Sequence, residues 1–364
     1  MERLSFEKVF YHVDHLNDYI NKGDCYPVHM IAGLANRCNH ACIWCYAHDT
    51  ISTRYNDNNF APAEMIVNTI NEAAQLGLRS VTLVGTGEPT LHPEFIEIIK
   101  GIKSSGVDIG IFTNGSLINE QMAEVIVNTH TFLRLSCSGY GLEEHNKIHH
   151  AGRPVNDFDQ IVVNMMCLLN KRVNKRGGQL FPTIGVQFSV NHHNYKSLLP
   201  ACRFWKDVGV DYYALKPVYK NRNVPEHEDN EVPFDEVIEL MKEAELLEDN
   251  RFKVYAKHEQ FKKVLNNKNT HRGYEECHGQ AFTTFLDPDG TLYICGNMHG
   301  QEKFSIGNVM KSGSFKAVWE GEVRRLLLRN LDVSKCPIGC RMDPLNLIIE
   351  DLTKPAQEIH PNFL

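Results

Sequence analysis

Three cysteines stand within eight residues of one another, in the segment RCNHACIWCYAHD at residues 37–49. Cys38, Cys42 and Cys45 follow the spacing C-x3-C-x2-C. A structural zinc site normally takes four ligands, often as two pairs of cysteines. A [4Fe–4S] cluster has four irons, so three thiolates from one loop leave one iron open to bind a small molecule. The spacing therefore favours a cluster whose fourth ligand is a substrate or a cofactor.

Three other interpretations of these cysteines stay open on the residues alone. Cys42 and Cys45 form a C-x-x-C pair, which is typical of thioredoxin-like redox sites, although this leaves Cys38 unexplained. His40 and His48 could instead complete a zinc site. Buried free thiols that do no chemistry are the third interpretation.

The composition excludes several classes of protein. The 364 residues are 42% hydrophobic and 23% charged, which predicts one large globular domain and a smaller one. A net charge of −7 disfavours nucleic acid as the partner. The sequence has no run of eighteen apolar residues and no secretory signal, so we expect a cytoplasmic protein without a membrane partner. In that compartment eleven cysteines are better explained by metal than by disulfides.

Strands and helices alternate from residue 27 onward, which predicts an α/β fold with a parallel sheet. The expected strands are residues 28–35, 80–85, 107–115, 131–139, 183–191 and 210–218. Six strands are fewer than the eight that close a full barrel, so we predict a partial (β/α)6 TIM-like barrel over residues 27–232. A lead-in helix in residues 1–26 should pack on the edge of the barrel. A small α+β domain should follow over residues 233–364, with a tight turn at residues 287–290 and a helix over 315–331.

The cysteine loop resembles the signature of the radical SAM superfamily, because an aromatic residue, Trp44, precedes its last cysteine. The resemblance implies that Cys38, Cys42 and Cys45 hold a [4Fe–4S] cluster and that S-adenosylmethionine (SAM) chelates the open iron. It implies a flavodoxin- or ferredoxin-type electron donor as a partner. It also implies that reduction releases a 5′-deoxyadenosyl radical, which takes a hydrogen atom from the substrate. The residue at the position of Trp44 is expected to lie near the adenine.

Further segments resemble this family in the same order, over residues 27–217. VGTGEPTLHPEF follows the second strand and is similar to the G-G-E-P motif, which holds the methionyl amino group of SAM. FTNGSL follows the third strand and matches another family segment. On the fourth strand, alternation places Arg134, Ser136 and Ser138 on one face. The cofactor-binding residues that the resemblance implies are Thr86, Gly87, Glu88, Pro89 and Asn114, with Ser136 toward the ribose and Arg153 and Gln187 as weaker candidates.

Four more cysteines lie toward the carboxyl end, at Cys277, Cys295, Cys336 and Cys340. Four thiolates suit either a zinc ion or a fully ligated iron–sulfur cluster. The run CHGQAFTTFLDPDGTLYICGN resembles the SPASM or twitch extension of radical SAM enzymes, which implies an auxiliary [4Fe–4S] cluster. The seventeen residues between Cys277 and Cys295 resemble the spacing in 2-deoxy-scyllo-inosamine dehydrogenase-like enzymes. A cluster with a complete set of protein ligands is suited to accept an electron.

The leading hypothesis is oxidation of an alcohol on a sugar or cyclitol-like substrate, with the auxiliary cluster as the electron acceptor. Radical epimerisation and peptide maturation are the enzymatic alternatives, so the substrate is a small molecule or a peptide. Peptide-modifying members of the family often carry a leader-recognition domain of about eighty residues, and because only about twenty-five residues precede the first barrel strand here, peptide maturation is less favoured but stays open. A protein of another class, a zinc-stabilised interaction module, is the last alternative.

Substitution of the two sets of cysteines should have different effects. Cys38→Ala, Cys42→Ala or Cys45→Ala should abolish reductive cleavage of SAM, because each removes one of only three ligands. Cys277→Ala should spare cleavage of SAM more than substrate turnover. Measuring 5′-deoxyadenosine and product in parallel checks both statements. Equal loss of cleavage and turnover in Cys277→Ala would instead indicate that Cys277 serves folding.

Overall fold

The computed structural model describes residues 5–45, 60–150, 152–175, 179–218, 231–266, 272–337 and 339–354. One ten-stranded sheet in the order β12-β11-β10-β1-β2-β3-β4-β7-β8-β9 organises the fold. The seven strands from β1 to β9 in this order pair in parallel. They are β1 (His29–Ala32), β2 (Ser80–Leu83), β3 (Asp108–Thr113), β4 (His130–Ser136), β7 (Thr183–Val190), β8 (Tyr212–Pro217) and β9 (Lys253–Ala256).

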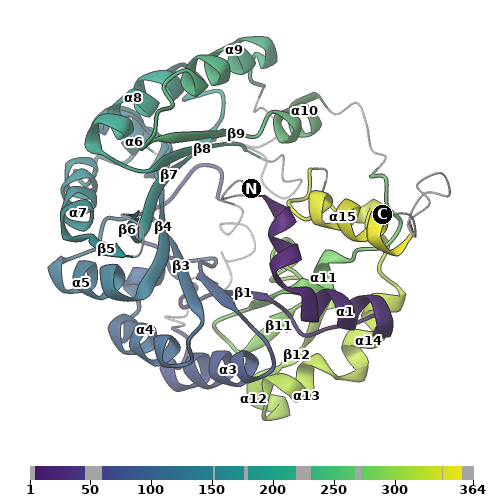
Figure 1. Cartoon of the computed structure of the whole chain (residues 1–364). Coiled ribbons are helices and arrows are strands. Elements are labelled where there is room, and N and C mark those ends of the chain that lie inside the picture. The colour runs from purple at the N-terminus through teal and green to yellow at the C-terminus, as the bar shows by residue number, and fades with distance from the viewer. Residues whose placement is uncertain are drawn as a thin grey trace.

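Helices connect successive parallel strands and cover the outer side of the curved sheet (Figure 1). Each buries one apolar stripe: α4, for example, buries Phe95, Ile98 and Ile102 against the sheet. These helices are α3 (Ala63–Gln75), α4 (Phe95–Ser104), α5 (Glu120–Thr129), α6 (Gly141–His149), α7 (Phe158–Lys171), α8 (Leu198–Val208) and α9 (Phe234–Glu245). The predicted partial barrel is therefore confirmed. Strand β9 is an additional parallel strand that the sequence pattern did not indicate.

Shorter elements lie between and beyond these units. The sequence prediction also missed α6, the β5–β6 hairpin, and α10 and α15 near the carboxyl end. The elements are η2 (Pro89–Leu91), β5 (Val173–Lys175), β6 (Gln179–Phe181), η4 (Tyr195–Ser197), α10 (His258–Asn266), α11 (Gly279–Phe282), η6 (Glu302–Phe304), α12 (Val309–Ser312), η7 (Val333–Lys335) and α15 (Asp343–Thr353).

The amino-terminal segment differs from its prediction as a single helix on the barrel's edge. It forms a 3-10 helix, η1 (Phe6–Tyr11), and then α1 (Val13–Lys22), because His12 between them has non-helical dihedral angles. Its buried residues Val9 and Leu16 join a small core with residues of α11 and α15. The segment is thus packed on the carboxyl-terminal part of the chain, as Figure 1 shows.

The carboxyl-terminal hairpin continues the barrel sheet rather than forming a separate one. Strand β10 (Thr283–Leu286) pairs in parallel with β1, and β11 (Thr291–Tyr293) and β12 (Ser305–Asn308) extend the sheet in antiparallel fashion. The predicted tight turn is present: Gly290 has φ 82° and its N–H donates to the carbonyl of Asp287 at 2.9 Å. The two cysteine regions are therefore tied to adjacent strands.

The helix predicted over residues 315–331 is two helices, α13 (Phe315–Trp319) and α14 (Glu322–Arg329). Gly321 between them is extended, with φ −69° and ψ 154°, and begins the second helix. The side chain of Arg324 in α14 is 1% exposed, donates to both oxygens of Asp24 and lies over the ring of Trp319. Arg324 is buried while Asp24 is partly exposed, and their bidentate ion pair holds the amino-terminal segment on the carboxyl-terminal helices.

No helix among the described ranges is long and apolar enough to cross a membrane.

Stability should fall on mild acidification because of a buried histidine. Burial, followed by the charge of Lys103, lowers the pKa of His130 to about 3. The unfolded chain, with a pKa near 6.5, binds more protons between these two values, so stability is full above pH 6.5 and falls below it. From pH 7 to pH 5 this residue should cost about 2 kcal/mol. Denaturant midpoints at both pH values should show a smaller difference in His130→Leu than in the wild type, and an equal difference would contradict this account.

Candidate active site

The cysteine loop leaves the carboxyl end of β1 and lies against the end of α6. The N–H of Ala41 donates to the carbonyl of His149 at 2.7 Å, and the N–H of Ile43 donates to the carbonyl of Ile148 at 3.0 Å. These two bonds hold the segment between Cys38 and Cys45 at the edge where the parallel strands end, which is where open α/β sheets place their sites.

The three thiols of the loop share a small, buried volume. Burial, followed by the charge of Glu88, raises the pKa of Cys38 to about 12. Burial, followed by the charges of Cys45 and Cys38, raises the pKa of Cys42 well above its ordinary value. Thiols that disfavour one another's ionisation in this way release their protons when a cation binds. The donor set therefore fits a metal centre with three protein thiolates.

The GTGEP segment after β2 approaches the cysteine loop so closely that only glycine fits. A Cβ added at Gly87 would lie 2.2 Å from the carbonyl oxygen of Arg37, and one at Gly85 would lie 2.9 Å from the Cα of Gly33. Thr86 donates its hydroxyl to Asn36 Oδ1. The glycines of the segment that resembles G-G-E-P therefore allow its backbone to pack tightly beside Cys38.

Glu88 connects this segment to the end of β3. Its carboxylate, in a side chain that is 3% exposed, accepts from the hydroxyls of Thr90 and Thr113 and from the N–H of Asn114 at 2.6–2.8 Å. The amide of Asn114 in turn donates to Asn39 Oδ1 at 2.9 Å, on the cysteine loop. Glu88 thus uses both oxygens within the protein and positions Asn114 against the loop.

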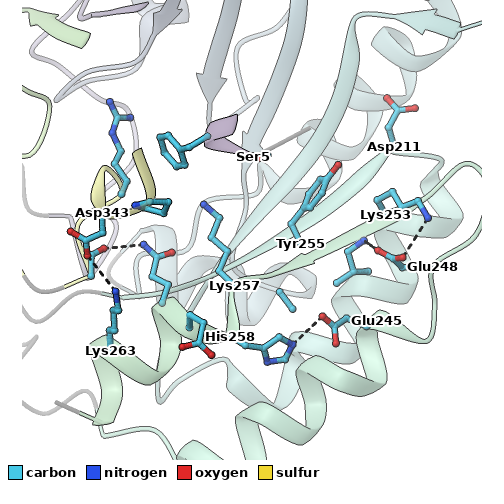
Figure 2. Close-up of a pocket in the computed structure, with 18 of the residues that line it drawn as sticks. Ser5, Asp211, Glu245, Glu248, Lys253, Tyr255, Lys257, His258, Lys263 and Asp343 are labelled. Atoms are coloured by element: carbon cyan, nitrogen blue, oxygen red, sulfur yellow. Dashed lines mark hydrogen bonds and ion pairs between the residues drawn. The ribbon is translucent and has the colours of Figure 1, made fainter. Parts of the chain in front are cut away.

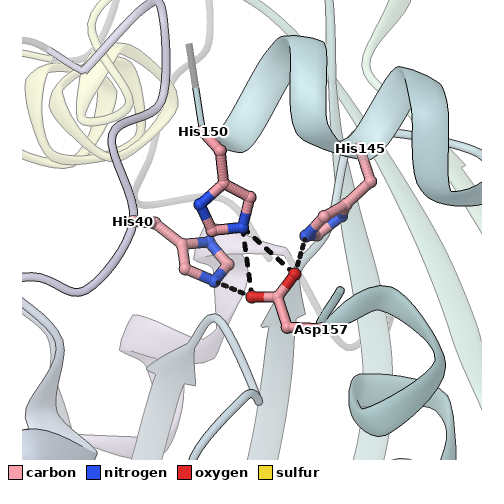
Figure 3. Close-up of side chains that lie close together, drawn as sticks. All are labelled: His40, His145, His150 and Asp157. Carbon is pink, nitrogen blue, oxygen red and sulfur yellow. Dashed lines mark hydrogen bonds and ion pairs between the residues drawn. The ribbon is translucent and has the colours of Figure 1, made fainter. Parts of the chain in front are cut away.

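A single carboxylate gathers three histidines beneath the cysteine loop (Figure 3). Asp157 Oδ2 lies 3.0 Å from His40 Nε2, and both oxygens of Asp157 lie 3.1 Å from His150 Nε2. Asp157 Oδ1 also lies 3.1 Å from His145 Nε2, but this contact is not aligned as a hydrogen bond. Burial by itself raises the pKa of Asp157, but the hydrogen bond and charge of His40 and its neighbours outweigh it and lower the pKa to about 2.

This network anchors His40, which lies between the first two cysteines, to the start of α7. Burial, opposed by the nearby carboxylate, lowers the pKa of His145 to about 4, so its ring is neutral near pH 7. His40, considered above as a zinc ligand beside His48, faces Asp157, and His48 lies outside the described residues, so a zinc site of this pair stays a prediction. Asp157 and its partners were not predicted as a unit, because up to 117 residues separate them in the chain.

His149 donates a hydrogen bond to one of the cysteine sulfurs. The backbone N–H of Ser138 donates to His149 Nε2 at 2.9 Å, so this nitrogen carries no proton. Burial lowers the pKa of His149 well below its ordinary value, and the neutral ring therefore carries its proton on Nδ1. His149 Nδ1 lies 3.1 Å from Cys42 Sγ. Partners of this kind orient metal ligands and set the potential of iron–sulfur clusters.

The remaining predicted cofactor-binding residues lie at different distances from the loop. The Trp44 ring packs edge-on against His149, with ring centroids 5.6 Å apart. Ser136 is at the end of β4 and pairs in register with Gln187, whose buried side-chain oxygen has no hydrogen-bond partner. Arg153 is exposed and donates to the carbonyl of His150. The structure thus gathers Trp44, Ser136 and Gln187 near the carboxyl ends of the strands and leaves Arg153 on the surface.

The second set of cysteines also converges. Burial, followed by the charges of Cys295 and Cys340, raises the pKa of Cys277 to about 12. Burial, followed by the charge of Cys340, raises the pKa of both Cys295, to about 11, and Cys336. The amide of Asn297 donates to Cys340 Sγ at 3.2 Å. Four mutually coupled thiols form a donor set that fits a fully ligated iron–sulfur cluster.

A cavity of about 900 Å³ lies beside the second set of cysteines (Figure 2). Cys340 and Arg341 contribute to its wall from one side, and Tyr255 and Lys257, in and just after β9, contribute from the other. The cavity therefore joins the last barrel strand to the carboxyl-terminal cysteines.

The fold and the two sets of thiols define an iron–sulfur protein built on an α/β partial barrel. Residues 34–183 match the radical SAM superfamily, and residues 277–341 match the SPASM family, described as an iron-sulfur cluster-binding domain. The chain thus contains a region that matches the radical SAM superfamily and, after it, a region that matches the SPASM iron–sulfur domain. Its cofactors are the radical SAM [4Fe–4S] cluster, SPASM auxiliary clusters and SAM, which the two donor sets fit.

Comparisons with curated proteins find partial similarity. The chain is 24% identical over 182 residues to the tungsten-containing aldehyde ferredoxin oxidoreductase cofactor-modifying protein of Pyrococcus furiosus, covering 49% of this chain and 48% of that protein. It is 34% identical over 96 residues to the GTP 3′,8-cyclase of Microcystis aeruginosa, covering 26% and 29%. The match spans about half the length of the Pyrococcus protein.

Solved structures share the fold over most of the chain. Streptococcus suis SuiB bound to S-adenosylmethionine superposes with a TM-score of 0.64 at 14% identity, covering 87% of this chain and 71% of SuiB. The protein anSMEcpe with bound AdoMet and Cp18Cys peptide gives 0.61 at 16% identity, covering 88% of both chains. At these identities the likeness shows the fold alone.

Removing the His149 donor should lower the reduction potential of the cluster that the cysteine loop binds. An N–H···S bond stabilises the more electron-rich reduced state, and a hydrogen bond to a charged group contributes about 1.5 kcal/mol, which corresponds to roughly 60 mV for one electron. A redox titration followed by EPR should show a shift of this size in His149→Phe. His193→Phe, a change at an exposed histidine, is the control. An unchanged potential in His149→Phe would exclude the hydrogen bond as a determinant.

Proposed function

We propose that this enzyme starts a radical oxidation of a substrate bound in the cavity beside β9. The observation that carries this proposal is the composition of the cavity wall, where Cys340 faces the same space as Tyr255 and Lys257 of the barrel. When bound, the SAM-loaded cluster supplies a 5′-deoxyadenosyl radical that removes a hydrogen atom, and the auxiliary cluster supplies an acceptor for the electron left on the substrate. A substrate in this cavity lies next to a ligand of that acceptor.

We assign the steps of this reaction to residues according to their positions in the fold. Cys38, Cys42 and Cys45 are proposed to hold the SAM-binding cluster, and His149 to orient Cys42 and tune its sulfur. Trp44, Ser136 and Gln187 are the proposed contacts of SAM, since they lie at or beside the carboxyl ends of the strands. Arg153, by its exposure, has the weakest support. The proposed ligands of the auxiliary cluster are Cys277, Cys295, Cys336 and Cys340.

A peptide is the first candidate for the substrate. Both SuiB and anSMEcpe, which share this fold, have been solved with peptides bound: the precursor peptide SuiA and the Cp18Cys peptide. This supports peptide modification over the sugar or cyclitol alcohol that the sequence favoured. Alcohol oxidation on a small molecule stays a prediction and is the second candidate, because a cavity of about 900 Å³ also accommodates one.

The expected products separate oxidation from the other radical reactions. Loss of one hydrogen atom, one proton and one electron from a C–H and an adjacent O–H, N–H or S–H leaves the substrate lighter by about two mass units. Anaerobically reconstituted enzyme with SAM and reductant should therefore form 5′-deoxyadenosine in step with a product of that mass, assayed over peptides, sugars and cyclitols. An unchanged mass with deuterium taken up from solvent would indicate epimerisation and contradict the proposed oxidation.

A further inference from the structure

The interior of the barrel carries positive charge that the protein does not neutralise. Along β4, Leu133 and Leu135 pack into the core with the helices, so Arg134 points to the opposite, inner face. Along β8, Tyr213 and Leu215 are in that core, so Lys216 also points inward. The Nε of Arg134 donates to the hydroxyl of Tyr212 at 3.0 Å, so the ring of Tyr212 reaches across β7, over Gly185, to the inner face of β4.

A third cation joins these two from the end of β9. Lys257 follows β9, and Figure 2 shows its side chain extending into the cavity beside Tyr255. Burial, followed by the positive charges of Arg134 and Arg341, lowers the pKa of Lys257 to about 8. Burial and the charges of Arg134, Lys257 and Arg341 also lower the pKa of Lys216 well below its ordinary value. The three cations are therefore close enough to repel one another.

None of the three makes an ion pair with a carboxylate in the described part of the chain, although five carboxylates line the cavity, those of Asp211, Glu245, Glu248, Glu259 and Asp343. The ion pairs of that part include neither Arg134 nor Lys216 nor Lys257, and the guanidinium of Arg134 contacts only aromatic groups: the ring of Phe112 at 4.6 Å and Tyr212. Burying cations without counter-charge is costly, and such groups occur where a ligand supplies the opposite charge.

The position of the three cations separates them from the cysteine loop. The loop follows β1, and Glu88 and Asn114 follow β2 and β3, whereas Lys216 and Lys257 belong to the other end of the parallel sheet, at β8 and β9. Lys257 lines the cavity that Cys340 also lines, and the charges of Arg134 and Lys257 act on Lys216. Lys257 is thus placed for a ligand of the cavity, whereas Arg134 shares a face of β4 with Ser136, a proposed contact of SAM, so displacement of a bound anion by SAM decides between the two ligands.

We propose that Arg134, Lys216 and Lys257 form a subsite that binds an oxyanion of the substrate, a phosphate or a carboxylate. This inference rests on the proposed location of the substrate in the cavity. The planar guanidinium of Arg134 can hold two oxygens at once, and the two ammonium groups act as point charges. For a peptide the oxyanion is an acidic side chain or a terminal carboxylate, and for a small molecule it is a phosphate or carboxylate group.

Calorimetry on the reconstituted full-length protein, with inorganic phosphate and with acetate as probes, tests the subsite. We expect the wild type to bind at least one of them and Lys216→Met and Lys257→Met each to weaken binding at least tenfold. Lys253→Met is the matched control, because Lys253 lines the same cavity but is exposed and pairs with Glu248. It should change the affinity by less than twofold. Binding of phosphate alone points to a phosphorylated substrate, and binding of acetate points to a carboxylate.

Thermal denaturation keeps the test independent of any failure to fold. Without an anion, Lys216→Met should melt at a higher temperature than the wild type, because it replaces a buried amine that has no ion-pair partner with an apolar side chain, and phosphate should stabilise the wild type more than the variant. The proposal is overturned if the wild type binds neither probe, if Lys253→Met loses as much affinity as the other variants, or if SAM displaces the probe. Wild-type cleavage of SAM, measured on the same samples, tests the proposed function separately.

Discussion

The carboxylate of Asp157 is the contact on which the geometry of the site depends. It accepts from His40 on the cysteine loop and from His150 at the end of α6, while itself standing at the start of α7. A loop that carries three thiols has no apolar stripe to bury and makes few backbone bonds of its own. The carboxylate and the two backbone bonds from Ala41 and Ile43 supply the order that the loop lacks. Losing one partner of such a buried network typically costs about 3–5 kcal/mol.

The continuous sheet then sets the relation between the two groups of thiols. Strand β1 leads into the first group, and its neighbour β10 lies between Cys277 and Cys295 of the second. The register between β1 and β10, His29 with Thr283 through Ala32 with Leu286, fixes one region against the other. The cavity at this junction has Lys257, just after β9, and Cys340 in the same wall. The barrel and the carboxyl-terminal region therefore work as one scaffold.

The sequence predicted those features that depend on the identity and spacing of residues close together in the chain. Local patterns could therefore be recognised: the cysteines Cys38, Cys42 and Cys45, the glycines of GTGEP, and the six apolar strands. The histidine–aspartate network could not, since His40 and Asp157 meet only through the packing of α6 and α7. The proposed cationic subsite was missed for a similar reason: strand alternation placed Arg134 alone, and Lys257 follows a short strand, KVYA, that has no clear periodicity. The helix breaks at His12 and Gly321 were not predicted, because the helical spacing of apolar residues continues on both sides of each break.

The EPR spectrum of the reduced, anaerobically purified protein, recorded with and without SAM, tests the central claim most directly. A cluster held by only three protein thiolates has an iron that SAM can bind, so addition of SAM should change the signal of one cluster. That component should be missing in Cys42→Ala. A protein without iron, or spectra that are identical with and without SAM, would contradict the account.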